Sequence, residues 1–294
     1  MRAGLAAAVA ALVAVAGLCG ASGGGATAGR DLSAYSGLGT WVDVYDVKLW
    51  ADPEAAVGGM ARRGVRTLFL ETSNYRRPED VVAPDLVDRF VDAAHANGLR
   101  IVAWYLPSLA NIGRDARRML AAARLRTPDG QGFDSVALDI EAKVVATARL
   151  RSARAAELAA RVRAALPAAV PLGAIVPSPR GMQLLPAYWP GFPFEGLARS
   201  ADVFLPMGYF TYRPTLRGGA GAYTRANVEL LRSGTGDPAV VVHAIGGLAS
   251  AATPEQVRAF AAAARSAGAL GWSLYDYAET RPEEWRALGA GGGR

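Results

Sequence analysis

Two carboxylates spaced two residues apart, Asp139 and Glu141, are the side chains of this sequence best placed to do chemistry. They end the run 133–141 (FDSVALDIE), whose short apolar stretch predicts a buried strand. Side chains alternate between the two faces of a strand, so Ala137, Asp139 and Glu141 share one face and the apolar residues between them share the other. The apolar face suits a covering helix, and the two acids then point into a site.

Two carboxylates on one strand face stand roughly 6–7 Å apart and repel each other when both are ionised, so one pKa should rise. We expect the raised pKa to belong to the outer residue, Glu141, which would then stay protonated and act as a general acid/base. The deeper Asp139 would stay charged or orient a substrate group. The alternative is that Asp139 is a structural acid, hydrogen-bonded to the neighbouring strands.

The elements that must position these acids repeat along the chain. Eight short β-rich runs alternate with helical segments, which predicts a parallel sheet with right-handed crossovers. Helix starts are marked by caps such as Asp52 and Thr253, each followed by proline. The pattern predicts an α/β fold, a single-domain (β/α)8 TIM barrel over residues 39–289. An open sheet of fewer strands is the alternative. No Gly-x-Gly-x-x-Gly follows the first run, and we expect no cofactor.

In such barrels the active site forms at the carboxyl ends of the strands. Those ends are rich in acids and aromatic residues, which we take as candidate substrate-binding residues: Asp43, Tyr45, Glu71, Trp104, Tyr105, Met207, Tyr209, Trp272 and Asp276. Carboxylates can deliver a proton and stabilise an oxocarbenium-like centre, and flat rings stack on sugars. The composition therefore predicts a glycan site, although polar strand ends that are merely solvated or structural remain the alternative.

The amino-terminal segment predicts secretion. Residues 1–28 have the features of a signal peptide: Arg2, an apolar stretch from Leu5 to Leu18, and a small-residue cleavage site at Ala26–Ala28. No later segment reaches about 18 apolar residues, so no membrane span is expected in the mature chain. We expect residues 29–38 to be a tether and residues 290–294 a flexible tail. The run 15–19 resembles a lipobox, so lipid anchoring through Cys19 is the alternative.

Residue counts exclude several other classes. Cys19 is the single cysteine and the two histidines, His95 and His243, lie far apart, so neither a disulfide framework nor a transition-metal site is expected. We expect His95 on a helix surface and His243 in the core or at the rim. The net charge of +6 is spread over helical segments without a basic, aromatic patch, so no nucleic-acid partner is expected. Attraction to an anionic cell wall stays open.

The acidic strand resembles the fourth-strand motif of family 18 glycoside hydrolases, the chitinase group, written D-x-x-D-x-D-x-E. Asp134, Asp139 and Glu141 match its first, third and last acids, and Ala137 stands in place of the second. The resemblance implies that Glu141 protonates the glycosidic oxygen and that Asp139 positions an acetamido group acting as nucleophile. The run 207–209 (MGY) is similar to the sixth-strand Met-x-Tyr, and 268–274 to the segment whose tryptophan, Trp272 here, floors the site.

The chain also resembles secreted, glycoside-hydrolase-like barrels of actinobacteria, through its opening at 39–46 (GTWVDVYD) and a second strand ending near Glu71. This likeness implies that Asp43, Glu71 or Asp276 supplies the second carboxylate. The leading hypothesis is a secreted glycosidase acting on a polysaccharide or cell-wall glycan. The alternatives are an inactive barrel that binds glycans as a lectin and a barrel hydrolase or lyase of non-sugar substrates.

Overall fold

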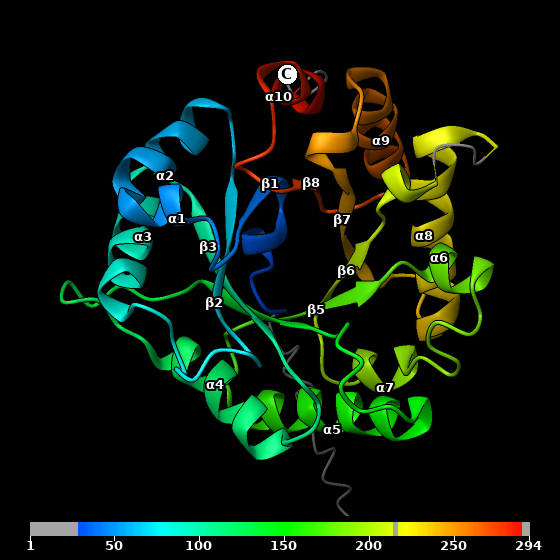
Figure 1. The fold of residues 1–294 in the computed structure, drawn as a ribbon, viewed down its shortest axis with the longest axis horizontal. Coiled ribbons are helices and arrows are strands. Elements are labelled where there is room, and N and C mark those ends of the chain that lie inside the picture. Colours follow the sequence, from blue (N-terminus) through cyan, green and yellow to red (C-terminus); the bar gives the residue numbers. More distant parts are fainter. Residues whose placement is uncertain (1–28, 214–216, 290–294) are drawn as a thin grey trace, which may run out of the picture.

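The computed structural model describes residues 29–213 and 217–289. The expected signal peptide, Cys19 and the expected tail at 290–294 lie outside these residues. Eight strands at the centre form a closed parallel barrel in the order of the sequence, and helices surround it (Figure 1). The predicted (β/α)8 barrel is confirmed, and the open sheet is excluded because β1 pairs with β8.

The elements follow one another as strand and helix, with short helices in the connections after β1, β5, β6 and β7. The strands are β1 (Gly37–Val42), β2 (Thr67–Asn74), β3 (Arg100–Leu106), β4 (Ser135–Asp139), β5 (Leu172–Pro177), β6 (Val203–Met207), β7 (Val241–Leu248) and β8 (Gly271–Tyr275). The α-helices are α1 (Val47–Ala51), α2 (Pro53–Arg62), α3 (Pro84–Ala96), α4 (Ile112–Arg124), α5 (Ala148–Ala165), α6 (Pro179–Leu184), α7 (Phe194–Ala198), α8 (Gly219–Thr235), α9 (Pro254–Ser266) and α10 (Pro282–Gly289).

Local sequence chemistry starts the helices as predicted. The Asp52 carboxylate accepts a hydrogen bond from Ala55 N at 3.1 Å and caps α2, with Pro53 at its first position. Thr253 and Gln256 form a reciprocal capping box at α9. These caps fix where α2 and α9 begin and therefore where the loops that lead into these two helices must end.

The barrel has two apolar layers separated by its strands. Inside, Trp41 stacks on Phe69 with ring centroids 4.3 Å apart, and these rings pack with the smaller side chains of neighbouring strands. Outside, the opposite faces of the strands pack against the helices. The alternation within β4 is as predicted: Ala137 lies inside, whereas Val136 and Leu138 lie in the outer layer.

The barrel starts earlier than residue 39. Tyr35, expected to lie in a tether, is fully buried at the amino ends of the strands. Its hydroxyl lies 2.7 Å from Ser135 Oγ and donates to the Val136 carbonyl at 3.0 Å. The expectation of a tether over 29–38 is therefore wrong for its last residues, which close this end of the barrel. A single aromatic residue in a short segment forms no periodic pattern, so the sequence did not predict that Tyr35 is buried.

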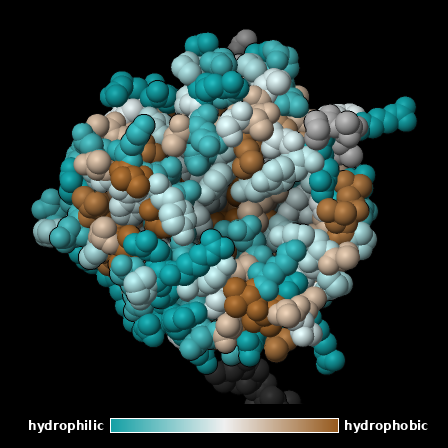
Figure 2. Space-filling view, viewed as in Figure 1, coloured by the Kyte–Doolittle hydropathy of each residue, from teal (hydrophilic) through white to brown (hydrophobic). Residues whose placement is uncertain are grey.

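The face drawn in Figure 2 is mostly polar, and its hydrophobic residues gather in small separate patches. Outside the atoms drawn in grey, this face shows no broad apolar surface of the kind that docks a protein partner. Among the described residues, none of the helices is both long enough and apolar enough to span a bilayer.

Candidate active site

Asp139 is the last residue of β4, and Glu141 lies two residues later in the turn that follows. The strand places Asp139 inside the barrel, 6% exposed, while Glu141 is half-buried nearer the mouth. Neither carboxylate makes a hydrogen bond or an ion pair with another described residue, and Asp139 Oδ1 is buried without any partner. The alternative of a structural Asp139, bonded to neighbouring strands, is therefore not what the structure shows.

Burial governs the protonation of this pair. It raises the pKa of Asp139 well above the ordinary value, and the neighbouring charges of Glu141 and Glu71 raise it further. Burial also raises the pKa of Glu141, against the opposing effect of the Arg76 guanidinium. We expected the raised pKa to belong to Glu141, with Asp139 staying charged or orienting a substrate group. The pKa of Asp139 rises as well, because its deeper position costs a carboxylate more hydration.

Glu71 lies within β2, which is buried along its whole length, and is 2% exposed. Its carboxylate accepts hydrogen bonds from Val44 N at 2.9 Å and from Asn74 Nδ2 at 3.0 Å. Burial raises its pKa to about 7, although both hydrogen bonds act in the opposite direction. Glu71 is thus a fixed carboxylate that changes charge near neutrality.

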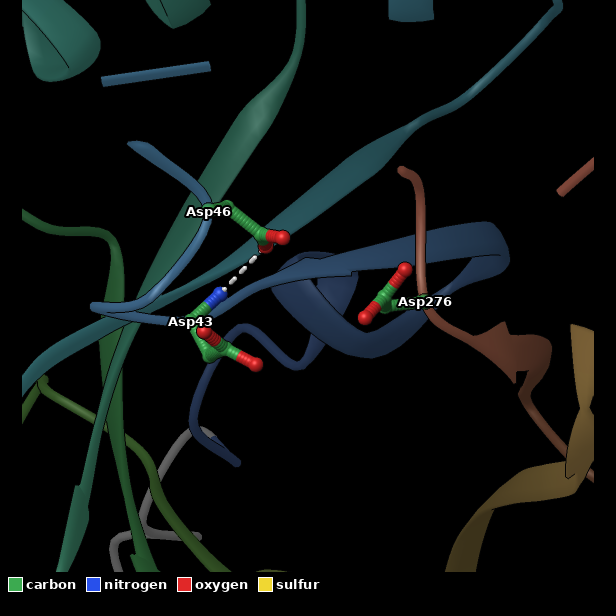
Figure 3. Close-up of side chains that lie close together, drawn as sticks. All are labelled: Asp43, Asp46 and Asp276. Carbon is green, nitrogen blue, oxygen red and sulfur yellow. Dashed lines mark hydrogen bonds between the residues drawn. The ribbon is translucent and has the colours of Figure 1, made fainter. Parts of the chain in front are cut away.

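Three further acids lie close together where β1 and β8 end. One oxygen from each of Asp43, Asp46 and Asp276 lies within 4.8 Å of the others, and Asp46 Oδ2 accepts from Asp43 N (Figure 3). Burial raises the pKa of Asp46 to about 7 and that of Asp276 to about 6. The hard oxygens of the three carboxylates are of the kind that binds a divalent cation. Asp43 is tied to the barrel by Tyr275, whose hydroxyl donates to Asp43 Oδ2 at 2.8 Å.

The mouth of the barrel contains two adjoining cavities. The acidic lobe, of about 170 Å³, is lined by Asp43, Tyr45, Glu71, Asn74, Arg76, Trp104, Leu106, Asp139, Glu141, Met207, Tyr209 and Tyr275. The aromatic lobe, of about 240 Å³, is lined by Glu141, Pro177, Ser178, Gly181, Met182, Leu185, Tyr188, Met207, Tyr209, Tyr212, Arg213 and Tyr223. Glu141, Met207 and Tyr209 line both, so Glu141 stands where the two lobes meet.

Aromatic rings form much of the wall around the acids. The rings of Tyr209 and Tyr275 lie 6.3 Å apart, and Tyr209 also packs edge-on against Tyr212 at 5.8 Å. The Trp104 indole is 5% exposed, and its Nε1 is buried without a partner in the described part of the chain. An unpaired donor, Trp104 Nε1–H, and an unpaired acceptor, Asp139 Oδ1, thus line the same cavity, and a polar ligand could satisfy both.

Two predicted site residues lie elsewhere. Tyr105 points to the outer layer, where its hydroxyl donates to Asp115 Oδ1 at 2.7 Å. Trp272 also belongs to the outer layer, with the Arg265 guanidinium 5.1 Å from its ring. Both expectations are wrong for the same reason: the neighbours Trp104 and Ser273 occupy the inner face, and adjacent side chains in a strand point opposite ways.

Replacing Tyr105 by phenylalanine tests this correction. The substitution should leave any activity of the barrel mouth unchanged but lower the free energy of unfolding by about 1–3 kcal/mol, because it removes a donor from the fully buried Asp115. Urea unfolding and initial rates measured on the same preparation check both expectations. A loss of activity without a loss of stability would return Tyr105 to the site.

Most of the remaining predicted residues line the acidic lobe, and the others lie outside it. Asp43, Tyr45, Glu71, Trp104, Met207 and Tyr209 line the acidic lobe with Asp139 and Glu141, whereas Asp276 lies behind Asp43 in the acid trio. His243 is fully buried as expected, with ring nitrogens 2.9 Å from Tyr35 O and 3.0 Å from Ser273 Oγ, and its pKa falls to about 4 because of burial.

Asp134, the first acid of the family 18 pattern, precedes β4 and lies at the opposite end of the barrel. It bonds there to Arg100 at 2.8 Å and to His95 at 3.1 Å. Asp134 therefore stabilises the amino-terminal end of the barrel and does not reach its mouth.

Sequence reasoning missed several residues of the mouth. Tyr275 ends β8 and was not among the predicted site residues, although alternation from Ser273 places it inside the barrel. Asn74 is the last residue of β2, and Arg76 lies in the loop after it. Tyr188, Tyr212 and Tyr223 come from the connections after β5 and β6. Loops follow no fixed period, so the sequence carried no signal for their positions.

Comparison with solved structures finds the same fold in several glycoside hydrolases. A class V chitinase from Pseudomonas fluorescens Pf-5 is 13% identical, with a TM-score of 0.60 over 88% of this chain and 100% of that chain. An endo-β-1,4-mannanase from Thermotoga petrophila is 10% identical, with a TM-score of 0.65 over 83% and 68%. The spore cortex-lytic enzyme SleL from Bacillus cereus is 9% identical, with a TM-score of 0.60 over 86% and 73%.

These likenesses establish the fold: the chain has a (β/α)8 barrel of the kind found in glycoside hydrolases. No family model matches the sequence, and a comparison with curated proteins gives no match either.

Proposed function

We propose that the protein is a glycoside hydrolase acting on a polysaccharide or cell-wall glycan, with Glu141 as general acid/base and Asp139 as the stabilising or orienting carboxylate. The observation that carries the proposal is the position of Glu141. Its carboxylate, free of any partner among the described residues, stands where the two lobes meet and next to the buried, unpartnered Asp139. A proton donor at the junction of two sugar-sized cavities suits cleavage of the bond between two sugars.

The chemistry assigned to each lobe follows from its lining. The acidic lobe would hold the sugar whose glycosidic bond breaks, because its carboxylates can stabilise positive charge developing at that centre. The aromatic lobe would hold the departing sugar against tyrosine rings. The raised pKa of Glu141 keeps the proton that the departing oxygen needs.

The second catalytic group has a short list of candidates in this proposal. Asp43, Glu71 and Asp139 line the acidic lobe, whereas Asp276 does not. Glu71 is held by two hydrogen bonds and would act as a carboxylate nucleophile or base. If the substrate carries an acetamido group, Asp139 and Tyr209 would position that group instead, as the resemblance to family 18 implies.

The likeness in fold supports this proposal. The neighbours are a chitinase, a mannanase and a spore cortex-lytic enzyme, and this likeness supports a glycan as the substrate. Secretion, cleavage after Ala28 and association with a cell wall are part of the proposal and rest on residues 1–28 and the basic charge. Amino-terminal sequencing of the protein recovered from culture medium tests secretion.

A glycan panel tests the activity directly. Purified protein is incubated with chitin, peptidoglycan, β-mannan, α-glucan and β-glucan, and new reducing ends are measured together with binding. Release from at least one polymer is expected. Binding without release from any of them would favour the lectin alternative, and neither binding nor release would contradict the assignment to glycans.

A further inference from the structure

A third cavity lies beyond the acidic lobe. This distal cavity, of about 510 Å³, is bordered by residues 45–49, by Arg63 after α2, and by the segment that leads from β8 into α10. Tyr45 lines both the distal cavity and the acidic lobe, and its side chain is 57% exposed. The Tyr45 ring therefore forms an exposed ridge between two hollows that adjoin each other.

The distal cavity has the chemistry of a sugar subsite. Tyr277 and Trp285 lie with ring centroids 5.6 Å apart, and the exposed Arg63 guanidinium lies 5.5 Å and 5.9 Å from those rings. Arg63 Nη1 donates to Gly59 O and to Tyr277 Oη, whereas its Nε and Nη2 have no partner within the described residues. Trp285 is 6% exposed and Tyr277 is partly buried, so these two rings mainly support the guanidinium. The free, planar donors of Arg63 suit hydrogen bonding to sugar hydroxyls, and the exposed Tyr45 ring suits stacking on a sugar.

Hydrogen bonds fix the position of Tyr45 relative to Glu71. Asn74 Nδ2 donates to Tyr45 Oη at 3.2 Å and to Glu71 Oε1 at 3.0 Å, so one amide positions both the ridge and a carboxylate of the acidic lobe. The order along the cleft is then aromatic lobe, Glu141, acidic lobe, Tyr45, distal cavity. The cleft therefore extends beyond the acidic lobe into the distal cavity, which leaves room for more than one sugar on that side.

We propose that the distal cavity binds further sugars of the same glycan chain, and that the enzyme cleaves within chains instead of removing terminal units. This inference rests on the proposed function and names its substrate class: a polymer long enough to run from the aromatic lobe across Tyr45. An enzyme that removes single terminal sugars needs a lobe closed behind the bond it cleaves, whereas here the acidic lobe adjoins an open, aromatic-lined hollow.

Substitution of Arg63 by alanine tests the cavity through chain length. The variant should lose about tenfold in kcat/KM for a hexasaccharide of the cleaved glycan, because charged hydrogen bonds to distal sugars disappear. The shortest cleaved oligosaccharide should react as with the wild type, since it does not reach the cavity. Arg62→Ala is the matched control, because Arg62 is an exposed neighbour that does not line the cavity.

A blocking variant gives a second, independent measurement. Ala278 lines the distal cavity with an exposed side chain, so Ala278→Trp should fill the hollow without disturbing the core. We expect the same selective loss for long substrates, with Ala55→Trp, on the outer surface of α2, as the control. Equal loss for short and long substrates in both variants, or no loss in either, would overturn the inference.

Binding measurements separate this inference from the proposed reaction. In a Glu141→Gln background, the affinity for the hexasaccharide should fall about tenfold on adding Arg63→Ala or Ala278→Trp. Unchanged affinity overturns the distal subsite even if hydrolysis by Glu141 is established. A selective loss of affinity supports the subsite even if Glu141 proves not to be the acid.

Discussion

Replacement of Glu141 by glutamine is expected to lower kcat for glycan hydrolysis by about a thousandfold while leaving the fold and glycan binding intact. Glutamine keeps the size of the side chain but has no ionisable proton to give to the glycosidic oxygen. Because Glu141 makes no hydrogen bond or ion pair with another described residue, the change removes no contact that stabilises the barrel. Initial rates, calorimetric binding and the urea midpoint are measured together.

The control is Glu157→Gln, which makes the same change on the exposed surface of α5 and should leave all three measurements unchanged. The pH profile adds a check, since activity that depends on protonated Glu141 should fall as pH rises through its raised pKa. If the Glu141→Gln variant retains more than about a tenth of wild-type kcat, another group supplies the proton and the assignment of Glu141 is wrong.

The strands and helices that position this site could be predicted from the sequence because their residue patterns are periodic. Strand alternation placed Ala137, Asp139 and the neighbouring apolar residues on their correct faces, and repeated units with capped helices predicted the closed barrel. The same rule applied strictly would have excluded Tyr105 once Trp104 was placed inside. The wrong expectations for Tyr105 and Trp272 arose because every polar or aromatic residue near a strand end was taken as part of the site.

The features of the site that the sequence did not predict depend on the paths of the loops and on how deeply each acid is buried. Arg76 reaches the acidic lobe, and Asp46 joins Asp43 and Asp276, only because of the paths that the loops take, which no periodic pattern encodes. The depth of burial sets how far the pKa of Asp139 rises. Spacing alone showed that one pKa must rise, but the extent of burial at Asp139 depends on side chains contributed by other strands.

Replacement of Asp139 by asparagine is expected to lower kcat by about a hundredfold or more and, at the same time, to stabilise the protein at neutral and alkaline pH. Asparagine cannot carry the charge that would stabilise or orient the reacting sugar. Asp139 is buried, and its Oδ1 has no partner among the described residues, so its ionisation opposes folding. The active site thus carries a cost in stability that the substitution relieves.

The pH dependence of this stabilisation follows from the direction of the pKa shift. The folded state holds the Asp139 proton at pH values where the unfolded chain has lost it, so the free energy of unfolding of the wild type falls as pH rises through that window. The asparagine variant lacks this fall. The two proteins should unfold at similar urea concentrations below the ordinary pKa of aspartate, and the variant should be more stable at pH 8 by about 1–3 kcal/mol.

Asp134→Asn is the matched control, because it changes an aspartate at the opposite end of the same strand. It should leave kcat unchanged and lower stability, since it weakens the interactions with Arg100 and His95. If Asp139→Asn were instead less stable than the wild type at pH 8, a compensating partner would have to hold the buried charge. If its kcat were unchanged, the charge at the base of the acidic lobe would have no part in the reaction, and Glu71 would become the candidate partner of Glu141.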